Sequence, residues 1–446
     1  MTNRLASFAL QSSRRQFLER TAAAAGAMAL AAPSLGATGA GNRVVLGLIG
    51  PGGMGMHHLR AFAGNPDAAV AYICDPDENR RRAAAAECEK LCGRPPRAVA
   101  DMRRVFEDRA VDAVVIATPD HWHTPAALLA LAAGKHVYVE KPCSHNIREG
   151  RLLVQAASRA SRVVQVGTQG RSNETARRGI ELLHRGAIGE VLVAKAWNSQ
   201  RRANIGHVQP SDPPPHLDFD LWLGPAPATP YRSNLLPSTW RWFADFGCGD
   251  AGNDGVHELD IARWGLGIDA HPNTIAALGG KYVFDDDQQF PDTQYVVFEY
   301  EAAGRKRQLI YEHRIWSPYV QEGLENGNAF YGTEGMMIFG KQTGWRMEGP
   351  QNKLIQELRG SWSLDPHHRN FLDAIRNGIA PHAGAATGHF SAALAHLANL
   401  ATRLGRTLRL DPLAERFAGD TEANASLART YRQGHWAVPP GLRRTP

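Results

Sequence analysis

The sequence predicts an α/β fold in two parts. The first is a doubly wound parallel sheet, and the second is an α+β region with a large, open, mostly antiparallel sheet. Up to residue 167, short β-branched runs alternate with helix-like stretches, as in strands joined by crossover helices. Beyond residue 190, strand-like runs follow one another with few helices between them. The 446 residues suffice for two ordinary domains, which we expect over residues 41–167 and 168–446.

The first forty residues are typical of a twin-arginine export signal. The pair Arg14-Arg15 precedes an Ala-rich apolar run over residues 21–32, and small residues follow near 38–40. The apolar run is about a dozen residues long, too short to cross a bilayer. We therefore expect a signal peptide over residues 1–40, a periplasmic or secreted protein, and no membrane insertion.

Composition excludes several classes of protein. Hydrophobic residues make up 43% of the chain and charged residues 21%, as in folded globular proteins. The net charge of +6 is spread along the chain without a basic block, so no nucleic-acid partner is expected. The five Cys residues show no repeated CxxC spacing, which argues against a disulfide scaffold or a structural zinc site.

A glycine-rich turn follows the first expected strand, residues 43–49. Gly50-Pro51-Gly52-Gly53-Met54-Gly55 has the G-x-G-x-x-G spacing and runs into a helix-like stretch through Phe62. Such glycines permit a tight turn, close approach of a pyrophosphate and close helix–strand packing. The next expected strand, residues 70–74, ends at Asp75, twenty residues beyond Gly55. An acid there binds ribose hydroxyls and disfavours a 2′-phosphate, so the sequence predicts a Rossmann domain that prefers NAD to NADP.

The alternation of strands and helices continues. Residues 111–117 predict a strand, 118–123 a loop, 124–133 a helix, 146–161 another helix, and 163–166 a further strand. The loop contains His121 and His123. Without further clustered ligands we interpret them as packing and hydrogen-bonding groups, and we expect no metal site.

The stretch Val137–Pro142 is a short strand followed by Glu140, Lys141 and a proline. Ligands of α/β proteins bind at the carboxyl ends of parallel strands. A partly desolvated Lys at such a place can take part in proton transfer. A surface Glu–Lys pair before a turn proline is the alternative that these six residues leave open.

Together, Gly50–Gly55 with Asp75, Thr118-Pro119 with His123, and Glu140-Lys141-Pro142 resemble the Gfo/Idh/MocA family of glucose-fructose oxidoreductases and inositol dehydrogenases. The resemblance extends over nearly the whole mature chain and favours exported members with a twin-arginine leader. It implies that Lys141 lies beside the nicotinamide and acts in substrate binding and proton relay. It implies cofactor contacts from Gly50, Gly52, Gly53, Met54, Gly55, Asp75, Thr118, Pro119, His123, Glu140 and Lys141.

The second half is expected to contribute strands over residues 191–197, 274–282, 293–301, 307–314 and 329–339, after a proline-rich loop over 207–227. Helices are expected over 368–377 and 388–404, and they could pack back on the first domain. In the family, such a sheet presents one face to substrate and the other to a subunit partner. A homodimer or homotetramer is therefore expected.

A helix is also expected from about Asn253, where the family has D-x-x-x-H with the His as base. His257 takes the place of that His, but Asn253 replaces the Asp. Asn cannot supply charge to the His, although it can bond a sugar hydroxyl. Asp254 would lie about 100° away around a regular helix, so it is a poor substitute unless the turn is irregular. His257 could also be a packing histidine or bind substrate only.

A sugar pocket would use aromatic side chains to stack on rings and polar side chains to bond hydroxyls. The expected substrate-binding residues are Gln169, Arg171, Tyr231, Trp240, Arg241, Asn253, Asp254 and His257.

The sequence thus predicts an exported, NAD-dependent oxidoreductase for a sugar, polyol or glycoside hydroxyl, with Lys141 and His257 as catalytic residues. Because no soluble nicotinamide pool is expected outside the cytoplasm, the cofactor should be tightly bound and re-oxidised in place. Two alternatives remain: a glycoside hydrolase that oxidises C3 transiently, and a non-catalytic sugar-binding protein of the same fold, which Asn253 keeps open.

Overall fold

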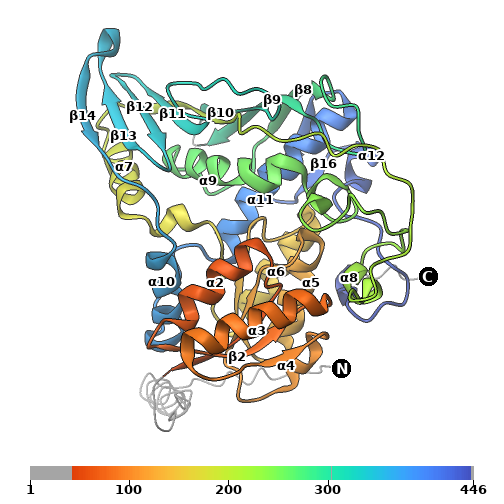
Figure 1. Ribbon diagram of the computed structural model, residues 1–446. Coiled ribbons are helices and arrows are strands. Elements are labelled where there is room, and N and C mark those ends of the chain that lie inside the picture. The colour runs from red at the N-terminus through yellow and green to blue at the C-terminus, as the bar shows by residue number, and fades with distance from the viewer. Residues whose placement is uncertain (1–42, 303, 443–446) are drawn as a thin grey trace, which may run out of the picture. The chain divides into compact units, whose positions relative to one another are not determined.

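The computed structural model describes residues 43–302 and 304–442 (Figure 1). The expected signal peptide lies outside the described residues. None of the helices in the described part of the chain combines the length and apolarity that a bilayer span requires.

The first sheet has six strands in the order β3-β2-β1-β4-β5-β6, and every pair is parallel. Crossover helices join most of the strands, which confirms the doubly wound parallel sheet. The strands are β1 (Val44–Ile49), β2 (Ala68–Cys74), β3 (Arg97–Val99), β4 (Ala113–Ile116), β5 (His136–Val139) and β6 (Val164–Val166). The helices are α2 (Gly53–Ala63), α3 (Glu78–Cys92), α4 (Arg103–Glu107), α5 (Asp120–Ala132) and α6 (Ile147–Ala160).

Helix α5 begins at Asp120, so the prediction of a loop over residues 118–123 is wrong for its last four residues. Inside the helix, Pro125 has no N–H to offer the carbonyl of His121. Arg429 Nη2 donates to that carbonyl at 2.6 Å instead. A contact across 308 residues thus replaces the missing helical bond.

The second sheet has ten strands in the order β14-β13-β12-β11-β7-β10-β9-β8-β15-β16. Only the β7–β10 pair among them is parallel in the described chain, which confirms the mostly antiparallel sheet. The strands are β7 (Val191–Asn198), β8 (Thr274–Gly280), β9 (Thr293–Ala302), β10 (Arg305–Arg314), β11 (Asn326–Gly332), β12 (Met336–Gly340), β13 (Gly344–Glu348), β14 (Leu354–Leu358), β15 (Leu408–Asp411) and β16 (Arg416–Phe417).

The expected single strand over residues 329–339 is a hairpin of β11 and β12. Gly332 N donates to Gly335 O at 2.9 Å and closes the turn. A Cβ on Gly332 would collide with Ile188 O, so the chain reverses where a side chain has no room.

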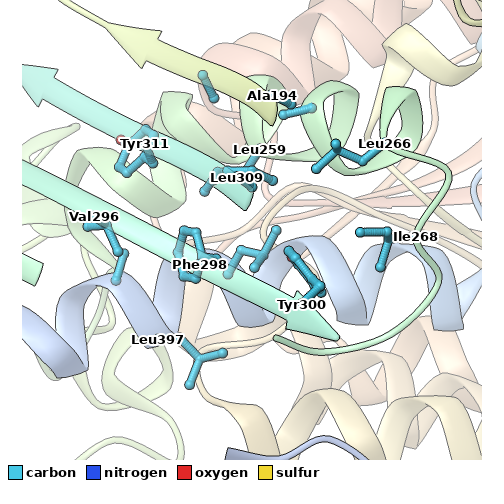
Figure 2. Close-up of a cluster of buried hydrophobic side chains, with 14 of the residues drawn as sticks. Ala194, Leu259, Leu266, Ile268, Val296, Phe298, Tyr300, Leu309, Tyr311 and Leu397 are labelled. Carbon is cyan, nitrogen blue, oxygen red and sulfur yellow. The ribbon is translucent and has the colours of Figure 1, made fainter. Parts of the chain in front are cut away.

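Helices α9 (Val256–Gly265) and α11 (Ala385–Leu404) pack beneath the second sheet. Figure 2 shows Leu259 and Leu397 from these helices against Phe298 and Leu309 of the sheet, all buried. Removing such apolar surface from water contributes about 1.5–3 kcal/mol per large side chain.

The remaining elements are α7 (Glu174–His184), α8 (Phe219–Leu223), α10 (Asp365–Asn377), α12 (Thr421–Ala425), and the short turns η1 (Gln169–Ser172), η2 (Thr239–Trp242), η3 (Ala251–Gly255), η4 (Pro350–Asn352) and η5 (Pro440–Leu442).

Two late segments return to the first sheet. Phe371 of α10 packs in one core cluster with Leu46 and Tyr138, on one face of that sheet. On the other face, Ala392 of α11 packs in one cluster with Leu153 of α6. The C-terminal helices thereby connect the two sheets.

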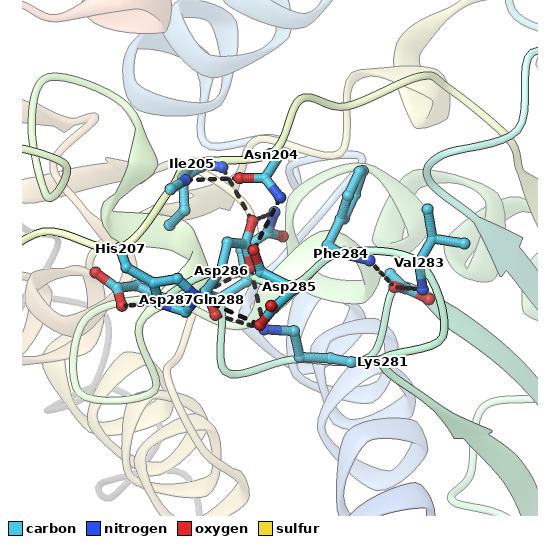
Figure 3. A network of polar contacts seen from close by, with 12 residues as sticks. Asn204, Ile205, His207, Lys281, Val283, Phe284, Asp285, Asp286, Asp287 and Gln288 are labelled. Carbon is cyan, nitrogen blue, oxygen red and sulfur yellow. Dashed lines mark hydrogen bonds and ion pairs between the residues drawn. The ribbon is translucent and has the colours of Figure 1, made fainter.

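The long connection between β7 and η2 is held by side chains of the β8–β9 loop. Asp287 accepts hydrogen bonds from His207 Nδ1 (2.9 Å), Val208 N (3.0 Å) and Asn234 Nδ2 (2.8 Å), and Asp286 accepts from Ile205 N (2.9 Å) (Figure 3). This irregular, proline-rich segment therefore has a fixed base on the second sheet.

Candidate active site

A cavity lies at the carboxyl ends of β1, β2, β4 and β5, where parallel α/β sheets bind ligands. Most of the predicted site residues line it: Gly50, Gly52, Gly53, Met54, Asp75, Thr118, Pro119, His123, Glu140, Lys141, Trp240, Arg241 and Asn253. The structure thus brings together residues from both halves of the chain.

The glycines of the first turn differ in the space around them. Gly50 has a φ of +84°, and a Cβ there would lie 2.7 Å from Ala117 O. A Cβ on Gly55 would collide with Gly50 O, so Gly55 permits the close packing of α2 on the turn. Gly53 meets nothing within 4 Å and leaves the start of α2 open. An open helix N-terminus of this kind binds phosphate groups through free N–H donors.

Asp75 follows β2 directly and lies buried in the cavity wall. Its Oδ1 accepts a hydrogen bond from Asp77 N at 2.8 Å. Burial raises the pKa of Asp75 to about 6, although the Asp77 N–H and the Arg80 charge act against this. Ribose hydroxyls at the carboxylate would replace part of the water that burial removes.

Three polar atoms of cavity-lining residues are buried without a hydrogen-bond partner: Thr118 Oγ1, Asp120 Oδ2 and Arg241 Nε. Buried donors and acceptors are costly when unsatisfied. A ligand with phosphate, amide and hydroxyl groups would satisfy them. Together with the glycine cradle and Asp75, these atoms fit a nicotinamide dinucleotide.

Glu140 anchors the end of β5. Its Oε1 lies 3.1 Å from His58 Nε2 and accepts from Gln169 Nε2 at 2.9 Å, while Oε2 accepts from Lys141 N at 3.1 Å. Burial acts to raise the pKa of Glu140, but the hydrogen bond from His58 and the charges of His58 and Lys141 lower it to about 2. The charged carboxylate therefore fixes the main chain at Lys141.

Lys141 reaches from the first sheet to the second half of the chain. Its Nζ donates to the main-chain carbonyl of Asn253 at 2.5 Å. The peptide bond from Lys141 to Pro142 is cis. The ammonium thus closes one end of the cavity against the turn of residues 251–255.

That turn is a π-helix, Ala251–Gly255, before the regular helix α9. The irregularity changes where Asp254 points: its Oδ2 accepts from Asn326 Nδ2 at 2.8 Å and lies 3.5 Å from Arg202. Asn253 Nδ2 donates to Asp250 Oδ1 at 3.2 Å. The wide turn places a carboxylate near His257 even though Asn occupies position 253.

His257 is half-buried beside Trp362, with ring centroids 6.4 Å apart. Burial and the positive charges of Lys341 and Lys141 hold its pKa well below the usual range, while Asp254 and Glu140 act in the opposite direction. The imidazole is therefore neutral around pH 7 and able to accept a proton.

Lys341, directly after β12, was not predicted from the sequence. Its Nζ lies 2.7 Å from Glu258 Oε1 and 3.3 Å from Asp254 Oδ1. Burial raises the pKa of Glu258 to about 8, and burial acts to lower that of Lys341, which its two carboxyl partners raise. We infer one cation shared between an ionised Asp254 and a mostly protonated Glu258. Nothing in the sequence marks Lys341 as a site residue, because its partners Glu258 and Asp254 lie 83 and 87 residues earlier in the chain.

Several predicted site residues lie outside the cavity lining. Gln169 contacts Glu140 from behind, and Arg171 forms a buried pair with Asp260 at 2.9 Å. Tyr231 packs in a small apolar cluster with Trp222. His123 does line the cavity, but both ring nitrogens contact carbonyls, of Thr118 (2.8 Å) and Pro142 (2.6 Å). Gly55, Asp254 and His257 are not among the lining residues either.

One cluster among the described residues has the spacing of metal ligands: His271, His389 and Glu415, all buried. Both Nε2 atoms lie 2.7 Å from Glu415 Oε1. Arg151 also binds both oxygens of this carboxylate. Because a guanidinium already holds the carboxylate, we interpret the cluster as a structural junction between α6 and the C-terminal segment.

The comparisons with known proteins agree with this geometry. Inositol 2-dehydrogenase 2 of Saccharopolyspora erythraea is 32% identical over 258 residues, which are 57% of this chain and 63% of that protein. A glycosyl hydrolase family 109 protein of the same organism is 32% identical over 154 residues, about a third of each chain. The chain thus covers less than two-thirds of the length of either relative.

Among solved structures, levoglucosan dehydrogenase in complex with NADH and levoglucosan superposes with a TM-score of 0.62 at 19% identity, over 82% of this chain and 99% of that one. This likeness shows the shared fold. Two family models match in sequence: the NAD-binding Rossmann fold of the oxidoreductase family over residues 44–168, and its C-terminal alpha/beta domain over residues 194–438. The chain belongs to the Gfo/Idh/MocA oxidoreductase family.

Proposed function

We propose that this protein is an NAD-dependent oxidoreductase that acts on a hydroxyl group of a sugar, polyol or glycoside. The observation that carries the proposal is the Lys141–Asn253 contact at 2.5 Å. It joins the strand end after the dinucleotide cradle to the turn that leads to a neutral His257. The names of the inositol and levoglucosan dehydrogenases support a carbohydrate substrate.

The cofactor would lie from Asp75, through Gly50–Gly55, to Lys141. NAD fits better than NADP, because a buried carboxyl group at position 75 repels a 2′-phosphate. Bound NAD supplies a hydride acceptor, and the chain supplies position and proton transfer.

In the proposed reaction, Lys141 and Asn253 hold the substrate oxygen at the closed end of the cavity. The ammonium of Lys141 stabilises negative charge that develops on that oxygen. His257, kept neutral by burial and the two flanking lysines, takes the hydroxyl proton through Lys141. Asp254 then stabilises the imidazolium, in the role that the family gives to the Asp at position 253.

A redox-neutral glycoside hydrolase is the second candidate, and the family 109 glycosyl hydrolase among the relatives favours it. In such a cycle, C3 of the sugar is oxidised, the C2 proton is lost, the aglycone is eliminated, and water addition and reduction restore the sugar. The same Lys141 and His257 would move the protons. A non-catalytic sugar-binding protein is the third reading, and the carboxylate of Asp254 near His257 argues against it.

The proposed location is the periplasm or the exterior, reached through the twin-arginine leader. An exported enzyme must carry its cofactor, so we propose a tightly bound NAD that is re-oxidised in place. Changing Arg14 and Arg15 to Lys should leave the protein in the cytoplasmic fraction of its host. Equal amounts of both forms outside the cytoplasm would contradict the proposal.

A homodimer or homotetramer is proposed from the outer face of the second sheet. Leu278 of β8 and Tyr295 of β9 lie directly opposite one another and are 76% and 44% exposed. Tyr331 of β11 is exposed on this sheet as well. Apolar side chains on an open sheet are typical of subunit contacts. Sedimentation of the purified protein gives the oligomeric state.

The decisive experiment begins with the nucleotide released from the denatured mature protein, identified by mass. The native protein is then given a panel of sugars and glycosides while NADH absorbance and aglycone release are followed. Bound NAD with stoichiometric reduction and a ketosugar supports the dehydrogenase. Free aglycone without lasting NADH supports the hydrolase. A protein that neither contains nor takes up nicotinamide excludes both enzymes.

A further inference from the structure

The cavity is not formed by the first sheet alone. Its wall near Asp75 also contains Leu217, Leu221, Trp222, Leu236 and Pro237, from the irregular segment between β7 and η2, and Trp436 from the C-terminal segment. An open α/β sheet binds a dinucleotide in a crevice outside the strand ends. Here a second segment of the chain crosses that crevice at the adenosine end.

The crossing segment is joined to the loop after β2 by main-chain hydrogen bonds. Glu78 N donates to His216 O at 2.9 Å, and Asp218 N donates to Pro76 O at 3.2 Å, on either side of the antiparallel bridge between Asp77 and Leu217. Further along, Arg80 Nη2 donates to Pro237 O at 3.1 Å. These bonds span the opening beside Asp75 at two places.

The segment is also held from behind. Trp222 O accepts from Trp122 Nε1 at 3.0 Å, and Asp220 forms an ion pair with Arg432 at 2.6 Å. Figure 1 shows α8 beside the C-terminal part of the chain. The segment has its own apolar cluster, including Leu217, Trp222 and Tyr231. Opening it would expose this cluster, so the closed form is favoured by burial of apolar surface.

We propose that residues 216–238, together with Trp436, form a retaining strap over the adenosine end of bound NAD. Trp122 and Trp436, with ring centroids 5.7 Å apart, and Leu217 and Leu221 supply the apolar surfaces that an adenine ring requires. The dinucleotide leaves only when the strap is displaced, which makes NAD a resident group and not a diffusing cosubstrate. This inference rests on the proposed function, because it assumes that NAD occupies the cavity.

The test measures exchange and not turnover. The full chain is purified, freed of unbound nucleotide, and incubated with excess isotopically labelled NAD. Samples are desalted and denatured, and the labelled fraction is read by mass.

Trp436→Ala and the Leu217→Ala/Leu221→Ala double variant should exchange about tenfold faster or more, since each loses apolar contact worth at least 1.4 kcal/mol. Trp316→Ala and Leu182→Ala, half-buried residues outside the cavity lining, are the matched controls and should exchange like the parent.

A reversible tether provides a test within one protein. Asp77 and Leu217 form a non-hydrogen-bonded pair, because the bonds flank them, so their Cα atoms should lie about 4.5 Å apart, within disulfide range. Asp77→Cys/Leu217→Cys, with the exposed Cys92 changed to Ser, should exchange NAD several-fold more slowly when oxidised than after reduction.

The outcomes separate the two proposals. NAD that is bound but exchanges equally fast in the parent, the strap variants and both redox forms of the tethered protein overturns the strap and leaves the oxidoreductase standing. No nicotinamide in the parent, and none taken up, overturns both. Slow exchange in the parent that is accelerated only by the strap variants and slowed by the tether supports the strap.

Discussion

The glycine turn on one side of the cavity and the turn of residues 251–257 on the other hold their groups by different means. Gly50–Gly55 acts through the space available to side chains, because Gly50 and Gly55 have no room for a Cβ. Residues 251–257 act through charge, because the charges of Lys341, Lys141 and Asp254 all act on His257. The cofactor side should therefore be sensitive to side-chain size, and the substrate side to side-chain charge.

The largest effect is expected from Lys141→Met, which keeps much of the side-chain volume and removes the ammonium. The kcat should fall by about 10³-fold, as when a proton-transfer group is lost, while NAD content stays unchanged. Steady-state kinetics and nucleotide analysis measure both. Lys306→Met, at an exposed Lys that pairs with Glu299, is the control. An equal loss of NAD and of kcat would mean that Lys141 acts through the cofactor and not through charge at the substrate.

A size effect on the cofactor side is tested by Gly55→Ala. The new Cβ would collide with Gly50 O, so the free energy of unfolding of the NAD-free protein should fall by about 2–3 kcal/mol. Denaturant unfolding measures this. Gly53→Ala, at a position with nothing within 4 Å, should change the same quantity by less than about 0.5 kcal/mol. Similar changes in the free energy of unfolding of Gly55→Ala and Gly53→Ala would contradict the conclusion that this side of the cavity is sensitive to side-chain size.

The charge account is sharpened by Lys341→Met. In the proposed reaction, activity needs neutral His257. Activity is therefore lost as the pH falls through the pKa of His257, which in the parent lies well below 6.5. Removing one flanking cation raises that pKa. The acid limb of kcat/KM should therefore move to higher pH by about one unit, equal to about 1.4 kcal/mol. Lys195→Met, which breaks a pair with Glu312 on the second sheet, should leave the limb in place. If the acid limb of kcat/KM lies at the same pH in Lys341→Met as in the parent, Lys341 only supports the fold.

The smallest effect is expected from Asn253→Asp, which restores the residue typical of the family. Asn253 Nδ2 now donates to Asp250 Oδ1 at 3.2 Å, so a second carboxylate there replaces a hydrogen bond with repulsion. The repulsion is greatest when both carboxylates are charged, so the cost should be about 1 kcal/mol at pH 7 and should diminish as the pH falls towards 4. Thermal unfolding at the two pH values checks this. A variant as stable as the parent at pH 7 would mean that the π-turn rearranges.

The cofactor side could be predicted from the sequence because its signals are local. Gly50–Gly55, Asp75 and Glu140-Lys141 each lie next to the strand that positions them, so strand order alone brings them together. Lys341 and the bonds of His216 and Pro237 to the loop after β2 could not be predicted, because their partners are distant in sequence. The start of α5 was misplaced for the same reason, since Arg429 supplies the missing bond.

The π-turn of residues 251–255 is equivalent to one residue inserted into a helix that would otherwise be regular. Deleting that residue would rotate everything before it by about 100° relative to α9. Asp250 would then leave Asn198 and Arg202, which it now contacts at 2.5 and 3.0 Å, while His257 kept its place. A single-codon deletion or insertion here would therefore rearrange the buried polar contacts of Asp250 while leaving the imidazole of His257 in place. This turn is a position at which descendants of one ancestral enzyme could diverge in substrate while retaining the same chemistry.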